Sequence, residues 1–247
     1  MPESITSNWQ PIPILTYHQI APTPPKGTPF RSLCVSPKNF ILQMRLLSIL
    51  GYRGLSMGEL LPYLYGKKKG KVVGITFDDG YFNNLEYALP ILKEHEFSAT
   101  CYVVSSLLGK TNLWDIDKGI PQVPLMNSDQ LCQWIDGGQE VGAHSRTHAC
   151  LPELTENECQ DEILGCKQDL ERLLGVSVQH FCYPYGAFDE SHARLVAEAG
   201  FLTATTTQRG RVAAGRDMRK LERVSVVRRT TRLGLLLKIA TRYESSR

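Results

Sequence analysis

Two adjacent carboxylates, Asp78 and Asp79, stand between an apolar run at 72–77 and Gly80. Placing two acidic groups at the end of a buried strand costs free energy, because they repel each other and lose contact with water. A bound metal cation would remove that cost. The alternative is an ordinary turn, since Asp-Gly is a common turn dipeptide. Taken alone, this segment supports both interpretations equally.

Two histidines form a second candidate group, because His144 and His148 follow the apolar run 141–143. At positions i and i+4, two imidazoles can converge on one ion from a single turn, although such pairs are often divided between surface and core. Two histidines and one carboxylate make a catalytic metal set that leaves a coordination position open for water. The second aspartate would then remain as a base, and the combination indicates hydrolysis rather than electron transfer.

A third segment, Tyr183-Pro184-Tyr185-Gly186, also follows an apolar run. The fixed φ of proline beside a flexible glycine is typical of a loop that aims its backbone N–H groups in a defined direction. On its own, an ordinary turn at the exit of a strand is the simpler explanation.

These segments need a scaffold that brings them together. Short apolar runs alternate with amphipathic stretches, which predicts parallel strands joined by right-handed crossovers. The expected strands cover 12–17, 72–77, 99–104, 140–143, 178–183, 202–206 and 224–227, and the expected helices cover 36–50, 85–97, 128–135, 155–174, 191–199 and 233–243. Because parallel strands end at one edge, the polar segments should meet on one rim. A barrel and a doubly wound sheet both fit this pattern.

The composition indicates one folded domain. The 247 residues are 42% hydrophobic and 21% charged, which is enough for a core, and the net charge of +3 is too small to indicate nucleic-acid binding. We expect an N-terminal extension at 1–11 and a single domain over 12–247.

Seven cysteines without a C-x-x-C pair indicate buried thiols in a reducing compartment. Neither a signal peptide nor a window of ~20 apolar residues is visible, so a cytoplasmic location is expected, with the oligomeric state open.

Together, the three motifs resemble those of the polysaccharide deacetylase family, carbohydrate esterase family 4, whose domain is also called the NodB-homology domain. That family carries a double aspartate before glycine, a histidine pair with Ser or Thr after the first histidine, and a motif that ends in Pro-Tyr. The matching residues are Asp78, Asp79, His144, His148, Pro184 and Tyr185. The resemblance runs from about Ile14 to the C-terminus.

The resemblance implies a distorted (β/α)7-type barrel that hydrolyses the acetyl group of an N-acetylated (or O-acetylated) sugar or glycan and releases acetate. It implies a divalent metal, usually zinc, held by Asp79, His144 and His148. It further implies that Asp78 activates a water molecule on the metal as the base. The Tyr185 backbone N–H would help to stabilise the oxyanion.

Two positions depart from the common family pattern. Many members have an arginine three residues before the motif tyrosine, where this chain has Cys182, and many have a late histidine, whereas none follows His192 here. The chain is more similar to the poly-N-acetylglucosamine deacetylase subgroup, which has an arginine on a late strand and a Tyr-His near the start. Arg223 and Tyr17-His18 fit that description. We therefore expect Arg223 to contact the base and orient it, or, equally, to be an exposed charge on an edge strand.

His18 is our candidate for the general acid, because it alone of the remaining histidines follows a buried strand. His95 and His192 fall in helical stretches, and His180 falls inside a strand. An imidazole also has a pKa suited to donating a proton near neutral pH. The alternative is a rim histidine that only hydrogen-bonds a neighbouring loop.

Two other functions remain open at this point: a sugar-binding relative without turnover, and a C–N hydrolase of a small non-sugar amide. The substrate could be a glycan, a nucleotide sugar or a lipid-linked sugar. Residues 216–247 hold ten Lys and Arg against three acids. This excess is typical of a solvated basic face, and a sharper hypothesis is weak peripheral contact with anionic lipid.

Overall fold

The computed structural model describes residues 10–241, 243 and 244 of the chain. Most of the expected N-terminal extension at 1–11, and the last residues of the domain expected over 12–247, therefore lie outside the described residues. Seven parallel strands form a closed ring in the order β1, β10, β9, β8, β7, β6, β5, and β5 pairs with β1 to complete it. This ring confirms the barrel and excludes the open sheet.

The barrel strands are short and buried, as expected for a parallel sheet covered on both faces. They are β1 (Ile14–Tyr17), β5 (Val72–Phe77), β6 (Thr100–Val103), β7 (Glu140–Ala143), β8 (His180–Cys182), β9 (Thr203–Arg209) and β10 (Leu221–Ser225). An outer strand, β4 (Arg53–Leu55), pairs with β5, and a small separate sheet joins β2 (Gln19–Ile20) to β3 (Cys34–Val35).

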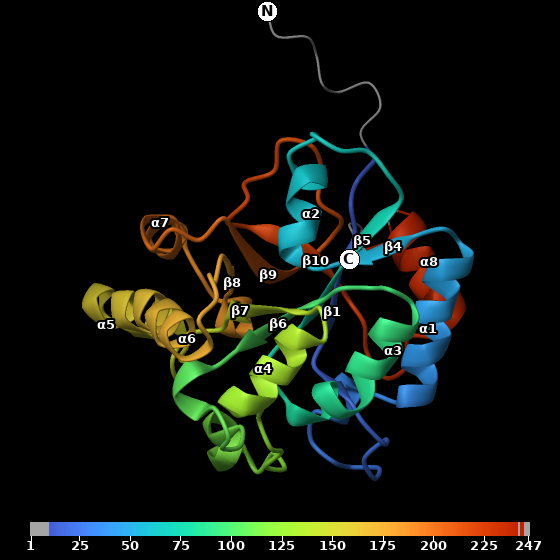
Figure 1. Cartoon of the computed structure of the whole chain (residues 1–247). Helices are drawn as coiled ribbons and strands as arrows, with labels where there is room; N and C mark the ends of the chain where they lie inside the picture. Colours follow the sequence, from blue (N-terminus) through green and yellow to red (C-terminus); the bar gives the residue numbers. More distant parts are fainter. Residues whose placement is uncertain (1–9, 242, 245–247) are drawn as a thin grey trace, which may run out of the picture.

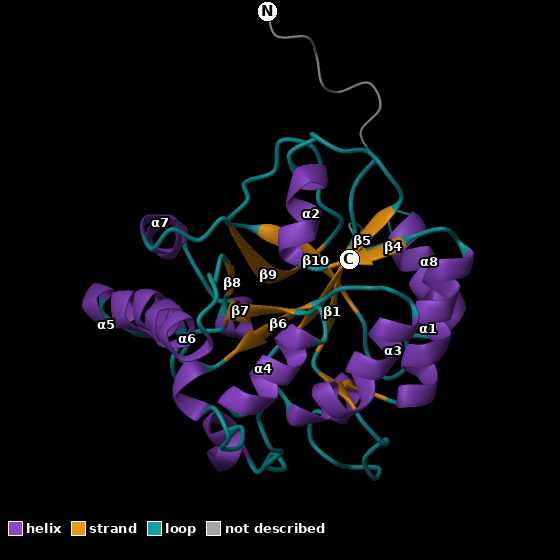
Figure 2. Cartoon of the chain, in the orientation of Figure 1, coloured by secondary structure: helices purple, strands orange, loops and turns teal. Residues whose placement is uncertain are grey.

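Helices surround the barrel (Figures 1 and 2). They are α1 (Pro37–Ile49), α2 (Met57–Leu64), α3 (Leu89–Glu94), α4 (Ser128–Asp136), α5 (Glu156–Gln160), α6 (Cys166–Leu174), α7 (Glu190–Glu198) and α8 (Arg232–Ala240). Local sequence explains their starts: the Ser36 side chain accepts from the Asn39 N–H, and Thr155 and Glu158 form a capping box.

Several boundaries differ from the expected ones. The helix expected at 85–97 begins with a π-helical turn, Asn84–Ala88, because Pro90 has no N–H to donate to the helix. The helix expected at 155–174 is also interrupted by a π-helical turn, Asp161–Gly165. The last strand lies at 221–225 rather than 224–227, which puts Arg223 in its middle. The unit β4–α2 was not expected, because it is short and Pro62 lies inside its helix.

The core is continuous between the barrel and its helices. Tyr17, Phe40, Phe77 and Trp134 are fully buried and pack ring against ring, with centroid distances of 5.2 Å for Tyr17–Phe40 and 5.8 Å for Phe77–Trp134. Such aromatic pairs fix the helices against the strands.

Each of the seven cysteines is a free thiol, and five of them are buried, as the sequence predicts. Within the described part of the chain, no helix is both long and apolar enough to span a bilayer.

Candidate active site

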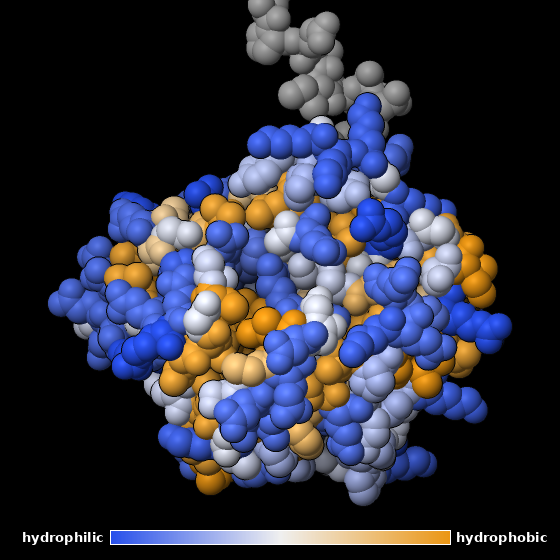
Figure 3. Space-filling model, viewed as in Figure 1, coloured by the Kyte–Doolittle hydropathy of each residue, from blue (hydrophilic) through white to orange (hydrophobic). Residues whose placement is uncertain are grey.

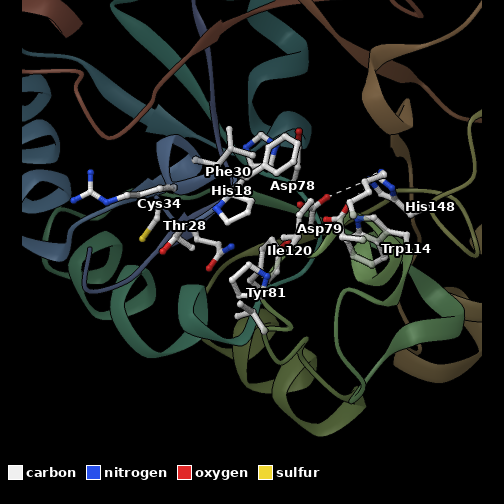
Figure 4. Close-up of a pocket in the computed structure, with 18 of the residues that line it drawn as sticks. His18, Thr28, Phe30, Cys34, Asp78, Asp79, Tyr81, Trp114, Ile120 and His148 are labelled. Carbon is white, nitrogen blue, oxygen red and sulfur yellow. Dashed lines mark hydrogen bonds and ion pairs between the residues drawn. The ribbon is translucent and has the colours of Figure 1, made fainter. Parts of the chain in front are cut away.

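Residues from all three motifs line one cavity of about 440 Å³ at the carboxyl ends of the barrel strands (Figure 4). His18 follows β1, Asp78 and Asp79 follow β5, and His144 follows β7. The segment after β8 adds Tyr183 and Tyr185, and His148 completes the set. The expected meeting of the motifs on one rim is therefore present.

Strained backbone is concentrated in this site. Six non-glycine residues have a positive φ in the described chain, and four of them belong to the motifs: Asp79 at 75°, Ser145 at 63°, His148 at 64° and Tyr185 at 58°. The left-handed region costs an L-residue of the order of 1–2 kcal/mol. Such strain persists where the surrounding structure enforces it, and it is typical of functional sites.

Asp79 lies between the two histidines. Its Oδ1 is 3.4 Å from His144 Nε2 and 3.4 Å from His148 Nε2, and all three side chains are buried. The other ring nitrogen of His144, Nδ1, donates to the Cys182 carbonyl at 2.7 Å, which directs the lone pair of Nε2 towards Asp79.

The His148 ring is held by aromatic neighbours. It stacks on Trp114 with a centroid distance of 4.4 Å and an interplanar angle of 20°, and it meets Tyr185 edge-on at 4.6 Å. Because Trp114 covers one face of the ring and Tyr185 meets it edge-on, the imidazole has a defined orientation.

These three side chains fit a metal ion. Two ligand atoms about 2.0–2.1 Å from a tetrahedral zinc ion lie about 3.4 Å apart. That spacing is the one found between Asp79 Oδ1 and each histidine nitrogen, and it is long for a direct hydrogen bond. The ligand atoms of Asp79, His144 and His148 all lie within 4.8 Å of one another. The donor set, two imidazoles and one carboxylate, is that of catalytic zinc sites.

The charge states of Asp79 and His148 suit a cation. Burial opposes the ionisation of Asp79, but the neighbouring imidazoles of His144 and His148 outweigh it and hold its pKa well below the usual range. Burial lowers the pKa of His148, which favours the neutral imidazole that a metal requires. Burial lowers the pKa of His144, but the nearby Cys182 and Asp79 outweigh it and raise that pKa well above its usual value, so a metal would have to displace a proton from this ring.

Asp78 is paired with Arg223, which is one of the two outcomes that the sequence left open. Nη1 donates to Oδ1 at 2.7 Å and Nη2 donates to Oδ2 at 2.8 Å, and both residues are buried. Burial raises the pKa of Asp78, but the charge and hydrogen bonds of Arg223 outweigh burial and lower it. Asp78 is therefore a carboxylate at neutral pH, and each oxygen keeps a lone pair for a further donor.

The guanidinium of Arg223 is itself fixed on every side. Its Nε donates to the Thr206 carbonyl at 2.9 Å, Nη1 also reaches Thr76 Oγ1 at 3.1 Å, and Nη2 reaches Cys182 Sγ at 3.2 Å. The Tyr102 ring lies 5.9 Å from its Cζ. Cys182, which stands where many relatives have an arginine, thus makes room for a guanidinium that comes from β10.

Of the four remaining histidines, His18 lines the cavity near the two aspartates (Figure 4), whereas His95, His180 and His192 are not among its lining residues. His180 is the first residue of β8, at the opposite end of the barrel from the site, and its Nδ1 lies 2.8 Å from Thr203 Oγ1. His192 belongs to the capping box of α7, and His95 ends α3.

The stretch 108–127, to which the sequence assigned no role, supplies several side chains to the cavity. Trp114 covers His148, and Lys118 donates to the Tyr185 hydroxyl at 3.3 Å. A second loop, 21–33, supplies Phe30 and several prolines to the same cavity. The sequence offered one indication that this stretch contributes to the site, namely Trp114 in an otherwise irregular segment.

Comparison with known proteins agrees with this site. A family model described as polysaccharide deacetylase matches residues 65–204. YxkH of Bacillus subtilis, a protein named after the same family, is 28% identical over 217 residues, which are 87% of this chain and 71% of that protein. The poly-beta-1,6-N-acetyl-D-glucosamine N-deacetylase of Staphylococcus aureus is 25% identical over 177 residues, 69% of this chain and 60% of that enzyme.

A solved structure extends the likeness to the whole fold. The deacetylase PplD of Streptococcus pyogenes, determined in complex with acetate, has a TM-score of 0.82 at 25% identity, covering 93% of this chain and 98% of that one. The family model matches more than half of the chain, and the three motifs converge on one rim of a barrel of the same fold. The chain therefore belongs to the polysaccharide deacetylase family.

Proposed function

We propose that this protein is a metal-dependent hydrolase that removes the acetyl group of an N-acetylated sugar and releases acetate. The observation that carries the proposal is the spacing of Asp79, His144 and His148, beside a second carboxylate held by an arginine. In this arrangement three side chains would bind the cation, and a separate carboxylate, that of Asp78, remains available to accept a proton.

Asp79, His144 and His148 would hold the metal, and zinc is the ion that this donor set suits best. When bound, such an ion would supply Lewis-acid polarisation of the acetyl carbonyl and of a water molecule. The His144 ring is already oriented for this role by the Cys182 carbonyl, and the His148 ring by Trp114 and Tyr185.

Asp78 would take the proton of the attacking water. Its two oxygens are held by Arg223, so the carboxylate cannot rotate away from the cavity. The same ion pair lowers its pKa, which weakens it as a base but keeps it ionised over the whole neutral range.

Two further groups would complete the reaction. The Tyr185 backbone N–H would stabilise the oxyanion of the tetrahedral intermediate. When the C–N bond breaks, the amine leaves with a proton that His18 would donate, because His18 lines the cavity near Asp78 and Asp79. The products are acetate and a free amino sugar.

The cavity accommodates the reacting end of a substrate rather than a long polymer segment, since its volume of about 440 Å³ lies within the ordinary range for small-ligand sites. Trp114 and Tyr185 offer aromatic surface at its mouth, which suits the apolar face of a sugar ring. The staphylococcal relative acts on poly-N-acetylglucosamine, and we infer an N-acetylhexosamine unit for this chain as well. The unit could be carried by a glycan, a nucleotide or a lipid.

The test is acetate release from N-acetylglucosamine oligomers, after the metal is stripped with a chelator and again after zinc is restored. We expect no release from the stripped protein, recovery with zinc, and no recovery in Asp78→Asn. Binding of the sugar without acetate release would identify a sugar-binding relative. Turnover of a simple non-sugar amide alone would identify a different C–N hydrolase.

A further inference from the structure

A surface formed by α1 and α8, outside the catalytic cavity, carries exposed apolar side chains and cations together. Its residues are Lys38, Ile41, Arg45 and Ile49 from α1, and Arg228, Arg229, Arg232, Leu233 and Leu237 from the segment that ends in α8. We propose that this α1–α8 surface binds an anionic lipid bilayer and holds the mouth of the cavity close to it.

The apolar side chains on this surface are unusually exposed. Ile49 is 72% exposed and Leu233 is 66% exposed, and Ile41 and Leu237 exceed 40%. Ile41, Arg45 and Ile49 follow one another at i, i+4 and i+8, so they share one face of α1, as Leu233 and Leu237 share one face of α8. Exposure of large aliphatic side chains to water is unfavourable, and their insertion at a lipid interface would lower the free energy.

The two helices lie side by side (Figure 1), and Gln43 of α1 donates to the Thr230 carbonyl before α8 at 2.8 Å. In Figure 3, apolar side chains reach the surface over these helices, at the right-hand edge of the view, among hydrophilic ones. The apolar and basic residues thus lie on two neighbouring helices.

The charge of this surface has one sign. Residues 37–49 and 226–241 include Lys38, Arg45, Arg228, Arg229, Arg232 and Lys238, and no Asp or Glu. Lys238 is paired with Glu244, while Lys38, Arg45, Arg229 and Arg232 are exposed. A cationic face with projecting aliphatic side chains matches an anionic bilayer, because lipid phosphates neutralise the arginines as the aliphatic groups enter the acyl boundary.

A hollow of about 380 Å³ between α1 and α8 suits a lipid headgroup. It is lined by Asn39, Leu42, Gln43 and the segment Arg228 to Arg232. The Nε of Arg228 is buried and has no hydrogen-bond partner among the described residues. Because that atom is enclosed, a phosphate group would instead be bound by the exposed cations that line the hollow, Arg229 and Arg232.

The surface adjoins the catalytic cavity. Both helices begin on the side where the barrel strands end, and the Arg228 N–H donates to the Ser32 carbonyl at 2.8 Å. Ser32 lies between Arg31 and Leu33, which line the cavity. Docking through the arginines would therefore present the cavity to molecules held at the membrane.

Sedimentation with vesicles tests this proposal without any need for enzymatic activity. One set of vesicles contains phosphatidylglycerol mixed with phosphatidylcholine, and the other contains phosphatidylcholine alone. We expect binding to the anionic vesicles only, weakening as salt is added. In Arg229→Ser/Arg232→Ser, binding should weaken about 5-fold per charge, about 25-fold in all, which is the equivalent of about 1 kcal/mol per cation.

Two other variants separate the contribution of the apolar side chains from that of the positive charges. Leu233→Ser/Leu237→Ser should weaken binding without changing the salt dependence. Lys68→Ser/Lys69→Ser removes the same charge from an exposed loop after α2 and should bind like the wild type. All variants should keep the melting temperature and the acetate release on a soluble substrate.

Three results would overturn the proposal. The first is no binding of the folded wild type to anionic vesicles at low salt. The second is an equal loss in the Lys68→Ser/Lys69→Ser control. The third is a wild-type dimer in light scattering that the leucine variant converts to a monomer, because the surface would then be an interface between copies of this chain.

Discussion

Arg223 and Asp78, 145 residues apart in the sequence, form a two-pronged ion pair inside the barrel, with N···O distances of 2.7 and 2.8 Å. The arginine comes from β10 and the aspartate follows β5, on either side of β1 in the barrel. A fork of two parallel hydrogen bonds fixes the plane of the carboxylate as well as its position. The proposed base is therefore oriented by the barrel itself.

Arg223→Met should destabilise the fold and abolish most activity. It leaves the Asp78 carboxylate buried without its partner, which typically costs about 3–5 kcal/mol. Urea denaturation would measure the free energy of unfolding. The double variant Arg223→Met/Asp78→Asn removes both charges and should recover part of that loss, whereas additive losses would show that the two side chains do not depend on each other.

The cost of Arg223→Met should also depend on pH. In the wild type, the folded-state pKa of Asp78 is lowered, so the ionised carboxylate stabilises the fold above its unfolded pKa of about 3.9 and loses that effect as the pH falls through the folded value. In the variant, the contribution of Arg223 that opposes burial is lost, so the pKa of Asp78 is higher than in the wild type and protonation at acidic pH removes an unfavourable buried charge. The difference in unfolding free energy between the wild type and Arg223→Met should become smaller as the pH falls from about 7 to about 4. A constant difference would mean that Asp78 titrates alike in both proteins.

Asp78→Asn should retain the metal and lose most turnover. The amide keeps the shape of the carboxylate but cannot accept a proton, and loss of a general base typically costs about 10²–10⁴-fold. Acetate release by the zinc-loaded variant measures the effect on kcat. A near-normal rate in that protein would mean that another group is the base.

These assignments differ in how far the sequence could predict them. Asp78, Asp79, His144 and His148 each directly follow or lie close to an apolar strand, so alternation of strands and helices was enough to place them on one rim. The contact of Arg223 with Asp78 was predicted only as one of two outcomes, because a strand register shifted by a few residues decides whether that side chain enters the barrel or faces water. The observed strand, Leu221–Ser225, places it inside.

The covering loops were less predictable. Trp114 reaches His148 through a stretch of 3₁₀ turns whose path depends on tertiary contacts rather than on periodicity. The unit β4–α2 went undetected because its strand has three residues and its helix contains Pro62. Short elements carry too few residues to show a hydrophobic period.

His18→Ala tests the proton donor. An amide expels an amine that must be protonated, whereas an activated acetate ester expels a group that leaves without a proton. We expect the variant to keep its metal and fold, to lose about 10²–10⁴-fold on the N-acetylated sugar, and to lose much less on the ester. His192→Ala, in the cap of α7, is the matched control. Equal losses on both substrates would indicate a structural role for His18.

The central claim is that Asp79, His144 and His148 hold a catalytic metal, and metal content measures it most directly. Each wild-type and variant protein is loaded with zinc, freed of excess metal and analysed by mass spectrometry. The account predicts about one equivalent in the wild type and in Asp78→Asn, and a large loss in Asp79→Ala, His144→Ala and His148→Ala, because each removes one of three protein ligands. A full equivalent retained in all three ligand variants would contradict it.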